Sequence, residues 1–170
     1  MSLKSIISII FILIFFLSCS KKVNEVSKVK ETNMERQMIE AYKEGLKELK
    51  RGDALFAAKK FNEAEILFPQ SDLAPRSALM AAYSYYSQNY YSDAIAELNR
   101  FLKVYPNYRD IAYAEYLLGL CYYEQIVDEK KDLKSIEKSK QIFSSIIKKY
   151  PNTDFAIDAE FKLDLIYDVL

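Results

Sequence analysis

The chain has 170 residues, with 24 Lys and Arg balanced by 24 Asp and Glu, no histidine and two cysteines. The zero net charge argues against nucleic acid as a partner, because phosphate binding needs a surplus of positive charge. The lack of histidine removes the commonest general base and metal ligand, and the sequence has no phosphate-binding loop, nucleophile elbow or metal-ligand spacing. We therefore expect a non-enzymatic protein without catalytic residues, metal or cofactor.

The first residues have the layout of a secretory signal peptide. Lys4 precedes twelve uncharged and mostly apolar residues, from Ile6 to Leu17, and a small residue, Ser18, stands before Cys19. The apolar run is too short for a transmembrane helix, which needs about 20 residues. We predict a signal peptide over residues 1–18, cleaved between Ser18 and Cys19.

The four residues from Phe16 to Cys19 resemble the lipobox of bacterial lipoproteins, although Phe16 stands where that motif usually has Leu. The resemblance implies that Cys19 carries an S-diacylglycerol and an N-palmitoyl chain, which tether the protein to a bilayer. Because Ser20, and not Asp, follows the cysteine, the resemblance implies the outer membrane. The alternative is an ordinary secreted protein in which Cys19 has no special role.

After Cys19 the composition changes. Residues 20–35 lack aromatic side chains and a helical apolar stripe, so we expect residues 19–35 to form a flexible linker that begins at the lipidated cysteine. The folded domain then covers residues 36–170. Its one cysteine, Cys121, has no partner for a disulfide and is expected to be a buried thiol.

Apolar residues in this domain recur at intervals of three and four, which predicts helices throughout. Ser71 is a candidate N-cap for the third of them. A polar loop is expected over 126–138. The helices are expected over residues 37–50, 53–67, 72–87, 92–104, 109–124, 135–149 and from about 153 onward.

Three aromatic-proline pairs, which end at Pro69, Pro106 and Pro151, indicate a repeat. The residues twelve positions before each proline are small, and those eight and five positions before are mostly large and apolar. Small residues also recur in the first helix of each unit, at Gly45, Ala82 and Gly119. The residues counted back from the prolines are Ala57, Ala94 and Ser139, then Phe61, Leu98 and Phe143, then Ala64, Phe101 and Ile146.

This pattern resembles the tetratricopeptide repeat, and it predicts an all-α solenoid of helical hairpins with about three and a half repeats. The third unit is eight residues longer than the others, which we assign to the loop at 126–138. A plain helical bundle is the alternative. The final helix has Asp164 at its small position and ends on the apolar residues Ile166, Val169 and Leu170, so we expect the natural chain to continue.

The segments that carry a resemblance to a known family are residues 81–86, 93–96, 99–106, 112–120, the acidic insertion, 150–153 and 158–159. With them, the chain as a whole resembles the BamD family, the tetratricopeptide lipoproteins of the outer-membrane β-barrel assembly machinery. The resemblance implies a lipid-anchored, periplasm-facing protein of the outer membrane that helps to insert β-barrel proteins. It also implies three kinds of partner: the barrel-forming subunit, the other lipoproteins of the machinery, and the C-terminal segments of unfolded barrel proteins.

In this class of repeat the first helix of each unit lines the concave face. Tyrosine suits such a groove because it offers a large contact area and a polar tip at a low entropic cost. We therefore expect a peptide-binding groove, although the same tyrosines could instead pack helix against helix. Its expected lining is Arg76, Leu79, Tyr83, Tyr86, Tyr113, Tyr116, Leu120 and Tyr123, and the same frame also projects Tyr42, Leu46, Leu49 and Glu124 onto the groove.

A different envelope lipoprotein built from the same repeats, such as a secretin pilot or a coordinator of cell-wall synthesis or division, is the alternative function.

Overall fold

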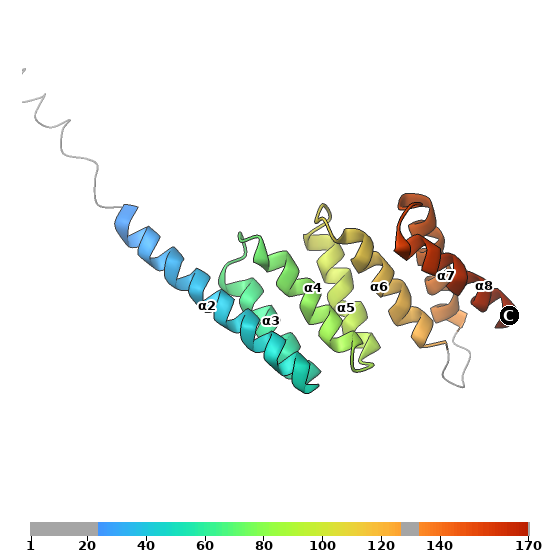
Figure 1. Cartoon of the computed structure of the whole chain (residues 1–170), viewed down its shortest axis with the longest axis horizontal. Coiled ribbons are helices and arrows are strands. Elements are labelled where there is room, and N and C mark those ends of the chain that lie inside the picture. The colour runs from blue at the N-terminus through green and yellow to red at the C-terminus, as the bar shows by residue number, and fades with distance from the viewer. Residues whose placement is uncertain (1–23, 127–132, 170) are drawn as a thin grey trace, which may run out of the picture. The chain divides into compact units, whose positions relative to one another are not determined.

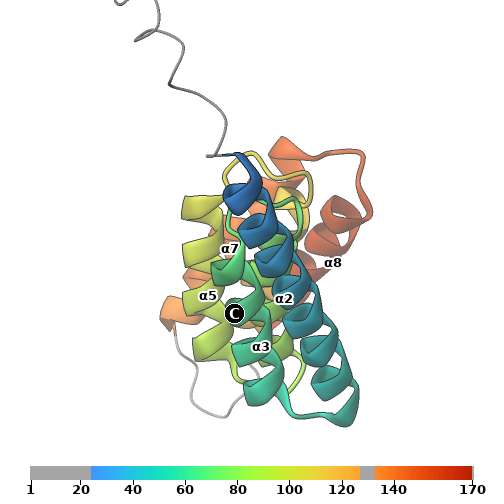
Figure 2. The same ribbon diagram turned by 90° about the vertical axis from the view of Figure 1, so that its left-hand side faces the viewer.

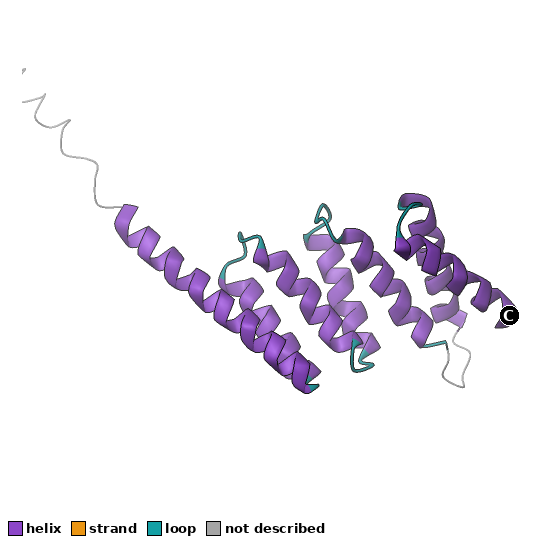
Figure 3. Cartoon of the chain, in the orientation of Figure 1, coloured by secondary structure: helices purple, strands orange, loops and turns teal. Residues whose placement is uncertain are grey.

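The computed structural model describes residues 24–126 and 133–169, which form helices joined by short turns and loops, with no strand among them (Figures 1 and 3). The all-α class expected from the sequence is confirmed. The helices are α2 (Asn24–Arg51), α3 (Ala54–Leu67), α4 (Leu73–Tyr86), α5 (Tyr91–Val104), α6 (Ile111–Glu124), α7 (Leu133–Lys149) and α8 (Asp154–Val169).

The chain divides into two units between Glu35 and Arg36, a division that α2 crosses. The expectation of a flexible linker over 19–35 is wrong from Asn24 onward, where the chain is helical. Residues 24–35 contain neither glycine nor proline, and adding turns to an existing helix is easier than nucleating a new one. Residues 1–23, with the expected signal peptide and Cys19, lie outside the described residues.

The helices of the second unit, residues 36–170, stack in the order of the sequence. Each helix from α3 to α7 packs against the next one, and contacts also link α4 with α6 and α6 with α8. In Figure 2, α5 and α7 lie on one side and α8 on the other. We call α4, α6 and α8, the first helices of their hairpins, the A helices, and α3, α5 and α7 the B helices.

The residues that define the repeat form the interior of this stack. All nine positions counted back from the three prolines are fully buried, which confirms the repeat frame as the packing frame of the fold. They are Ala57, Ala94 and Ser139, Phe61, Leu98 and Phe143, and Ala64, Phe101 and Ile146.

The small residues allow the two helices of each hairpin to approach closely. A Cβ atom added to Gly45 would lie 2.9 Å from the ring of Phe61, and one added to Gly119 would lie 2.7 Å from the ring of Phe143. Ala82 is fully buried at the equivalent position of the second repeat. Any larger side chain at these positions would push the A helix away from the aromatic residue behind it.

Most helix ends lie within two residues of the expected ones. Gly52, in the left-handed region at φ 83°, ends α2, and the Asp53 carboxylate accepts a hydrogen bond from the Phe56 amide (3.0 Å) to cap α3. The hydroxyl of Ser71, the expected N-cap, accepts a hydrogen bond from the amide of Ala74 (3.1 Å).

The expected loop at 126–138 is partly wrong, because α7 begins at Leu133. Ile136 is buried in the core and continues the apolar face of α7, so folding gains from the extra helical turns. The rest of that loop, residues 127–132, lies outside the described residues.

The apolar residues of α8 differ in burial from what the sequence indicated. Ile166 is buried against the core, whereas Ile157, Phe161 and Leu165 are exposed along one stripe of α8. Asp164 is exposed. The side chains of Val169 and Leu170 lie outside the described residues.

We expect Gly119→Ala to lower the free energy of unfolding by about 1–3 kcal/mol, because the new methyl group would overlap the fully buried ring of Phe143. Urea unfolding followed by circular dichroism would measure the loss. Lys47→Ala, at an exposed position of a helix, is the control and should change stability by less than about 0.5 kcal/mol.

In a Phe143→Leu background, the same glycine substitution should cost less, because the shorter side chain leaves room for the methyl group. An equal cost in both backgrounds would contradict the packing argument.

Candidate functional site

A pocket of about 350 Å³ lies on the A-helix side of the second unit, between α4 and α6. It brings together four of the eight residues expected to line a groove, namely Arg76, Leu79, Tyr83 and Tyr113. Two further residues complete its lining, Met80 and Asp110. The pocket therefore combines an apolar base, two phenol rings and one side chain of each charge.

Helical spacing explains the α4 side of this pocket. Arg76, Leu79 or Met80, and Tyr83 follow one another at intervals of three and four residues, so their side chains share one face of the helix. The guanidinium of Arg76 also lies 5.9 Å from the ring centre of Tyr42 on α2. This contact fixes the guanidinium group beside the Tyr42 ring at the margin of the pocket.

Tyr113 forms the opposite wall, on α6. Burial and, second, the neighbouring Tyr83 raise the pKa of Tyr113 to about 12. Its hydroxyl is therefore protonated at neutral pH and able to donate a hydrogen bond. Phe155 of α8 packs against the other side of its ring, with 5.9 Å between ring centres, so the ring has a fixed position before any ligand arrives.

The structure does not bring Tyr116, Leu120 or Tyr123 to this pocket, because side chains of α8 contact the two tyrosines and Leu120 lies in the core. The Tyr116 hydroxyl donates a hydrogen bond to Asp158 (2.5 Å), and its ring packs on Phe155 with 5.2 Å between centres. The ring of Tyr123 lies 4.9 Å from the ammonium group of Lys162, and Leu120 is buried in the core. Their principal contacts are between helices.

Tyr86 also lies outside the pocket, one helical turn beyond Tyr83. Its ring packs between those of Tyr83 and Tyr91, at 6.5 and 6.1 Å between centres. Burial and the nearby carboxylate of Glu124 raise its pKa to about 12. Tyr86 therefore buttresses the ring of Tyr83, which does line the pocket.

The groove positions projected from the first repeat were wrong, because these residues belong to its core. Tyr42 is buried with its ring edge toward Phe61, at 5.2 Å between centres, and Leu46 and Leu49 pack against the same cluster. Glu124 is half-buried beyond the end of the pocket.

Sequence reasoning missed Met80 and Asp110. Met80 is adjacent to Leu79, and the assumed helical phase could not decide which of the two faces outward. Asp110 precedes α6 as its N-cap residue. It reaches the pocket only because α6 begins opposite Arg76, and the sequence carries no signal of that placement.

The two cysteines differ in what the structure says about them. Cys121 is fully buried on α6, and burial raises the pKa of its thiol to about 12. Cys19 and Ser18 lie outside the described residues.

Within the described ranges, no group of three or more His, Cys, Asp or Glu side chains is placed to hold a metal ion. In the same ranges, none of the helices is sufficiently long and apolar for a membrane span.

Comparison with known proteins agrees with the fold and extends over most of the chain. The sequence model of the family YfiO, described as "Outer membrane lipoprotein", matches residues 34–170. A protein of Caulobacter vibrioides named outer membrane protein assembly factor BamD is 36% identical over 152 residues, which are 89% of this chain and 49% of that protein.

Two further relatives carry the same name. The Rickettsia prowazekii protein is 38% identical over 129 residues, which are 76% of this chain and 51% of that protein. The protein of Neisseria meningitidis serogroup B is 26% identical over 164 residues, covering 91% of this chain and 61% of that protein. The chain thus spans about half the length of the first two relatives.

The burial of Cys121 leads to a reactivity prediction. In a Cys19→Ser variant, which leaves Cys121 as the only thiol, we expect iodoacetamide at pH 8 to react at least about a hundredfold more slowly with the folded chain than with the chain in urea. Mass spectrometry of timed samples measures both rates. Rapid modification of the folded chain would show that the thiol is accessible.

We also expect the stability of the fold to depend on pH through the same thiol. Because its pKa is raised on folding, the buried neutral form stabilises the fold fully below about pH 9, and this contribution is lost as the pH rises to about 12.

Proposed function

This chain belongs to the YfiO family of outer membrane lipoproteins, which includes the BamD assembly factors, and on that premise we propose that it helps to assemble β-barrel proteins into the outer membrane. In this proposal the second unit of the chain, residues 36–170, binds unfolded barrel proteins through the pocket between α4 and α6. The partners are the barrel-forming subunit of the assembly machinery and its other lipoproteins.

The observation that carries the peptide-binding part is the lining of that pocket. Arg76 supplies a cation suited to a terminal carboxylate, and Tyr83 and Tyr113 supply aromatic walls on two neighbouring units. Leu79 and Met80 supply an apolar base. An extended segment that ends in an aromatic residue and a free carboxylate has the matching chemistry, and the C-terminal strand of an unfolded barrel protein is such a segment.

The anchoring part of the proposal rests on the sequence. Cys19 follows a signal-like segment, and acyl chains on this residue would hold the protein on the inner leaflet of the outer membrane with the repeat unit facing the periplasm. The family match begins at residue 34, beyond the proposed anchor. The anchor therefore rests on the signal layout and the lipobox resemblance, and not on the family model.

We expect Tyr113→Ala to weaken binding of a fluorescein-labelled peptide, copied from the last strand of a barrel protein, by about tenfold or more. A buried aromatic anchor at an interface is worth about 2 kcal/mol. Fluorescence polarisation with the full chain in detergent measures the dissociation constant. Tyr90→Ala, which removes an exposed tyrosine outside the pocket, is the matched control. Equal losses in the two variants would reject the pocket as the binding site.

Arg76→Gln should weaken binding about fivefold when the peptide has a free carboxylate, and much less when its C-terminus is amidated, because only the free carboxylate gains from the guanidinium. The same loss for both peptides would show that Arg76 acts through packing.

In cells, depletion of the protein should lower the amount of folded barrel proteins in the outer membrane. A plasmid copy of the unaltered gene should restore it. A Cys19→Ala copy should leave the protein in the soluble periplasmic fraction. Unchanged barrel levels on depletion would reject the assembly role, and continued membrane attachment of the variant would reject the anchor.

A further inference from the structure

A polar bridge joins the B helices of the first two repeats. Glu65 on α3 is buried and accepts two hydrogen bonds from the guanidinium of Arg100 on α5, at 2.9 and 2.6 Å, and a third from the hydroxyl of Tyr105 at 2.7 Å. Arg100 also donates to Glu97 (2.8 Å), which in turn accepts from the amide of Asn62 on α3 (2.8 Å). Side chains therefore fill the space between α3 and α5.

The next junction, between α5 and α7, has different residues at three of the four helix positions of this bridge. Counted back from the closing prolines Pro69, Pro106 and Pro151, Asn62 corresponds to Asn99 and Glu65 to Leu102. In the same frame Glu97 corresponds to Ile142, and Arg100 to Ser145. Asparagine is therefore present at both junctions. The second junction has two apolar residues in place of the two glutamates, and a short serine in place of the long arginine.

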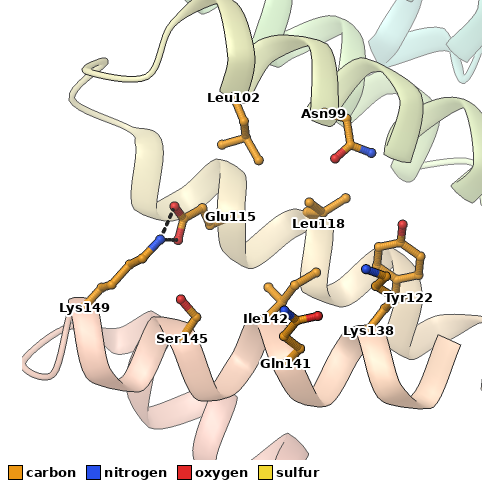
Figure 4. Close-up of a pocket in the computed structure, with 10 residues that line it drawn as sticks. All are labelled: Asn99, Leu102, Glu115, Leu118, Tyr122, Lys138, Gln141, Ile142, Ser145 and Lys149. Carbon is orange, nitrogen blue, oxygen red and sulfur yellow. Dashed lines mark hydrogen bonds and ion pairs between the residues drawn. The ribbon is translucent and has the colours of Figure 1, made fainter. Parts of the chain in front are cut away.

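A pocket of about 310 Å³ occupies the space that the bridge fills at the first junction. In Figure 4, Leu102 and Asn99 extend from α5, and Ile142, Gln141 and Ser145 extend from α7, toward Leu118 of α6 between them. All four corresponding residues, Asn99, Leu102, Ile142 and Ser145, line it. The pocket therefore results from specific replacements at a repeated position.

The apolar base of the pocket is framed by polar and basic groups. At one end Lys149 pairs with Glu115 (2.9 Å), and at the other Lys138 is exposed and makes no ion pair among the described residues. The amides of Asn99 and Gln141 likewise have no hydrogen-bond partner within the described ranges. Helix α7 carries five lysines and one glutamate, although the whole chain is neutral.

We propose that this pocket is a second protein-binding site, which takes a partner segment with an apolar side chain next to a carboxylate. The apolar side chain rests on Leu102, Leu118 and Ile142, and the carboxylate pairs with Lys138. The amides of Asn99 and Gln141 bond to the backbone of the segment. The site lies among the B helices, so it is separate from the α4–α6 pocket and stands or falls independently of the function proposed above.

Charge complementarity selects this occupant. A basic ligand would be repelled by Lys138, the exposed lysine of the pocket, and a purely apolar ligand would make no contact with its charge or with the two amides. An extended segment with an apolar and an acidic residue two positions apart satisfies all three kinds of group, because side chains at every second position of an extended chain point to the same side.

The probe is a fluorescein-labelled peptide in which pairs of aspartates alternate with pairs of leucines, so that each side of the extended chain carries both residues. It is compared with a peptide in which lysine replaces each aspartate. With the full chain in detergent, we expect saturable binding of the aspartate peptide, weakened by added salt, and at least about tenfold weaker binding of the lysine peptide. Equal binding of the two peptides would overturn the proposal.

The decisive variant rebuilds the bridge of the first junction. Leu102→Glu with Ser145→Arg should close the pocket and reduce binding of the aspartate peptide at least about tenfold, while circular dichroism shows an intact fold. Fold retention is expected because the same pair of residues, Glu65 and Arg100, fits between α3 and α5. Unchanged affinity in this variant would overturn the proposal.

A charge reversal provides a second test that leaves the pocket open. Lys138→Glu should weaken binding about fivefold, whereas Lys148→Glu, an exposed lysine of the same helix outside the pocket, should leave it unchanged. Equal effects of the two reversals would show that only the general charge of α7 matters. Binding to anionic lipid vesicles without binding to the peptide would identify this face as a lipid surface and reject the protein-binding site.

Discussion

The close approach of two helices at a small residue is the constraint from which the rest of this fold follows. Gly45 faces Phe61 and Gly119 faces Phe143 at distances that exclude even one added methyl group, and Ala82 is buried in the same frame. Each hairpin thereby gains a fixed spacing, and one hairpin alone would leave its large apolar residues exposed. Stacking covers them, so the spacing inside a hairpin also sets how successive hairpins meet.

This stacking gives the two sides of the repeat unit different characters. On the A side, α4 contacts α6 and α6 contacts α8, and aromatic residues from adjacent repeats come together. Tyr116 donates a hydrogen bond to the next A helix, whereas Tyr83 and Tyr113 line the pocket together with Arg76 and Asp110. On the B side, residues between the helices decide whether a junction is closed, as by Glu65 and Arg100, or open, as at Leu102 and Ser145.

The sequence predicted the core better than the groove. Positions counted from Pro69, Pro106 and Pro151 are buried because a repeat imposes the same environment at equivalent positions, and this rule needs no knowledge of neighbours. The groove depends on which A helix lies beside which. Arg76, Leu79, Tyr83 and Tyr113 reach the pocket, whereas Tyr116 and Tyr123 are engaged by Asp158 and Lys162 of α8. Periodicity could not separate Tyr113 from Tyr116 and Tyr123, since the spacing of the three residues places them on the same face of α6.

The sequence by itself determined the all-α class, the repeat frame, the small-against-large pairing within each hairpin and the resemblance to an outer-membrane lipoprotein family, because these properties depend on local spacing. Tertiary structure alone decided which tyrosines remain at a pocket and that Asp110 lines the same pocket as Arg76. It alone also decided that the loss of a bridge between α5 and α7 leaves a cavity. The physical reason is that a pocket is the space left between elements distant in the chain, and its size depends on every side chain around it.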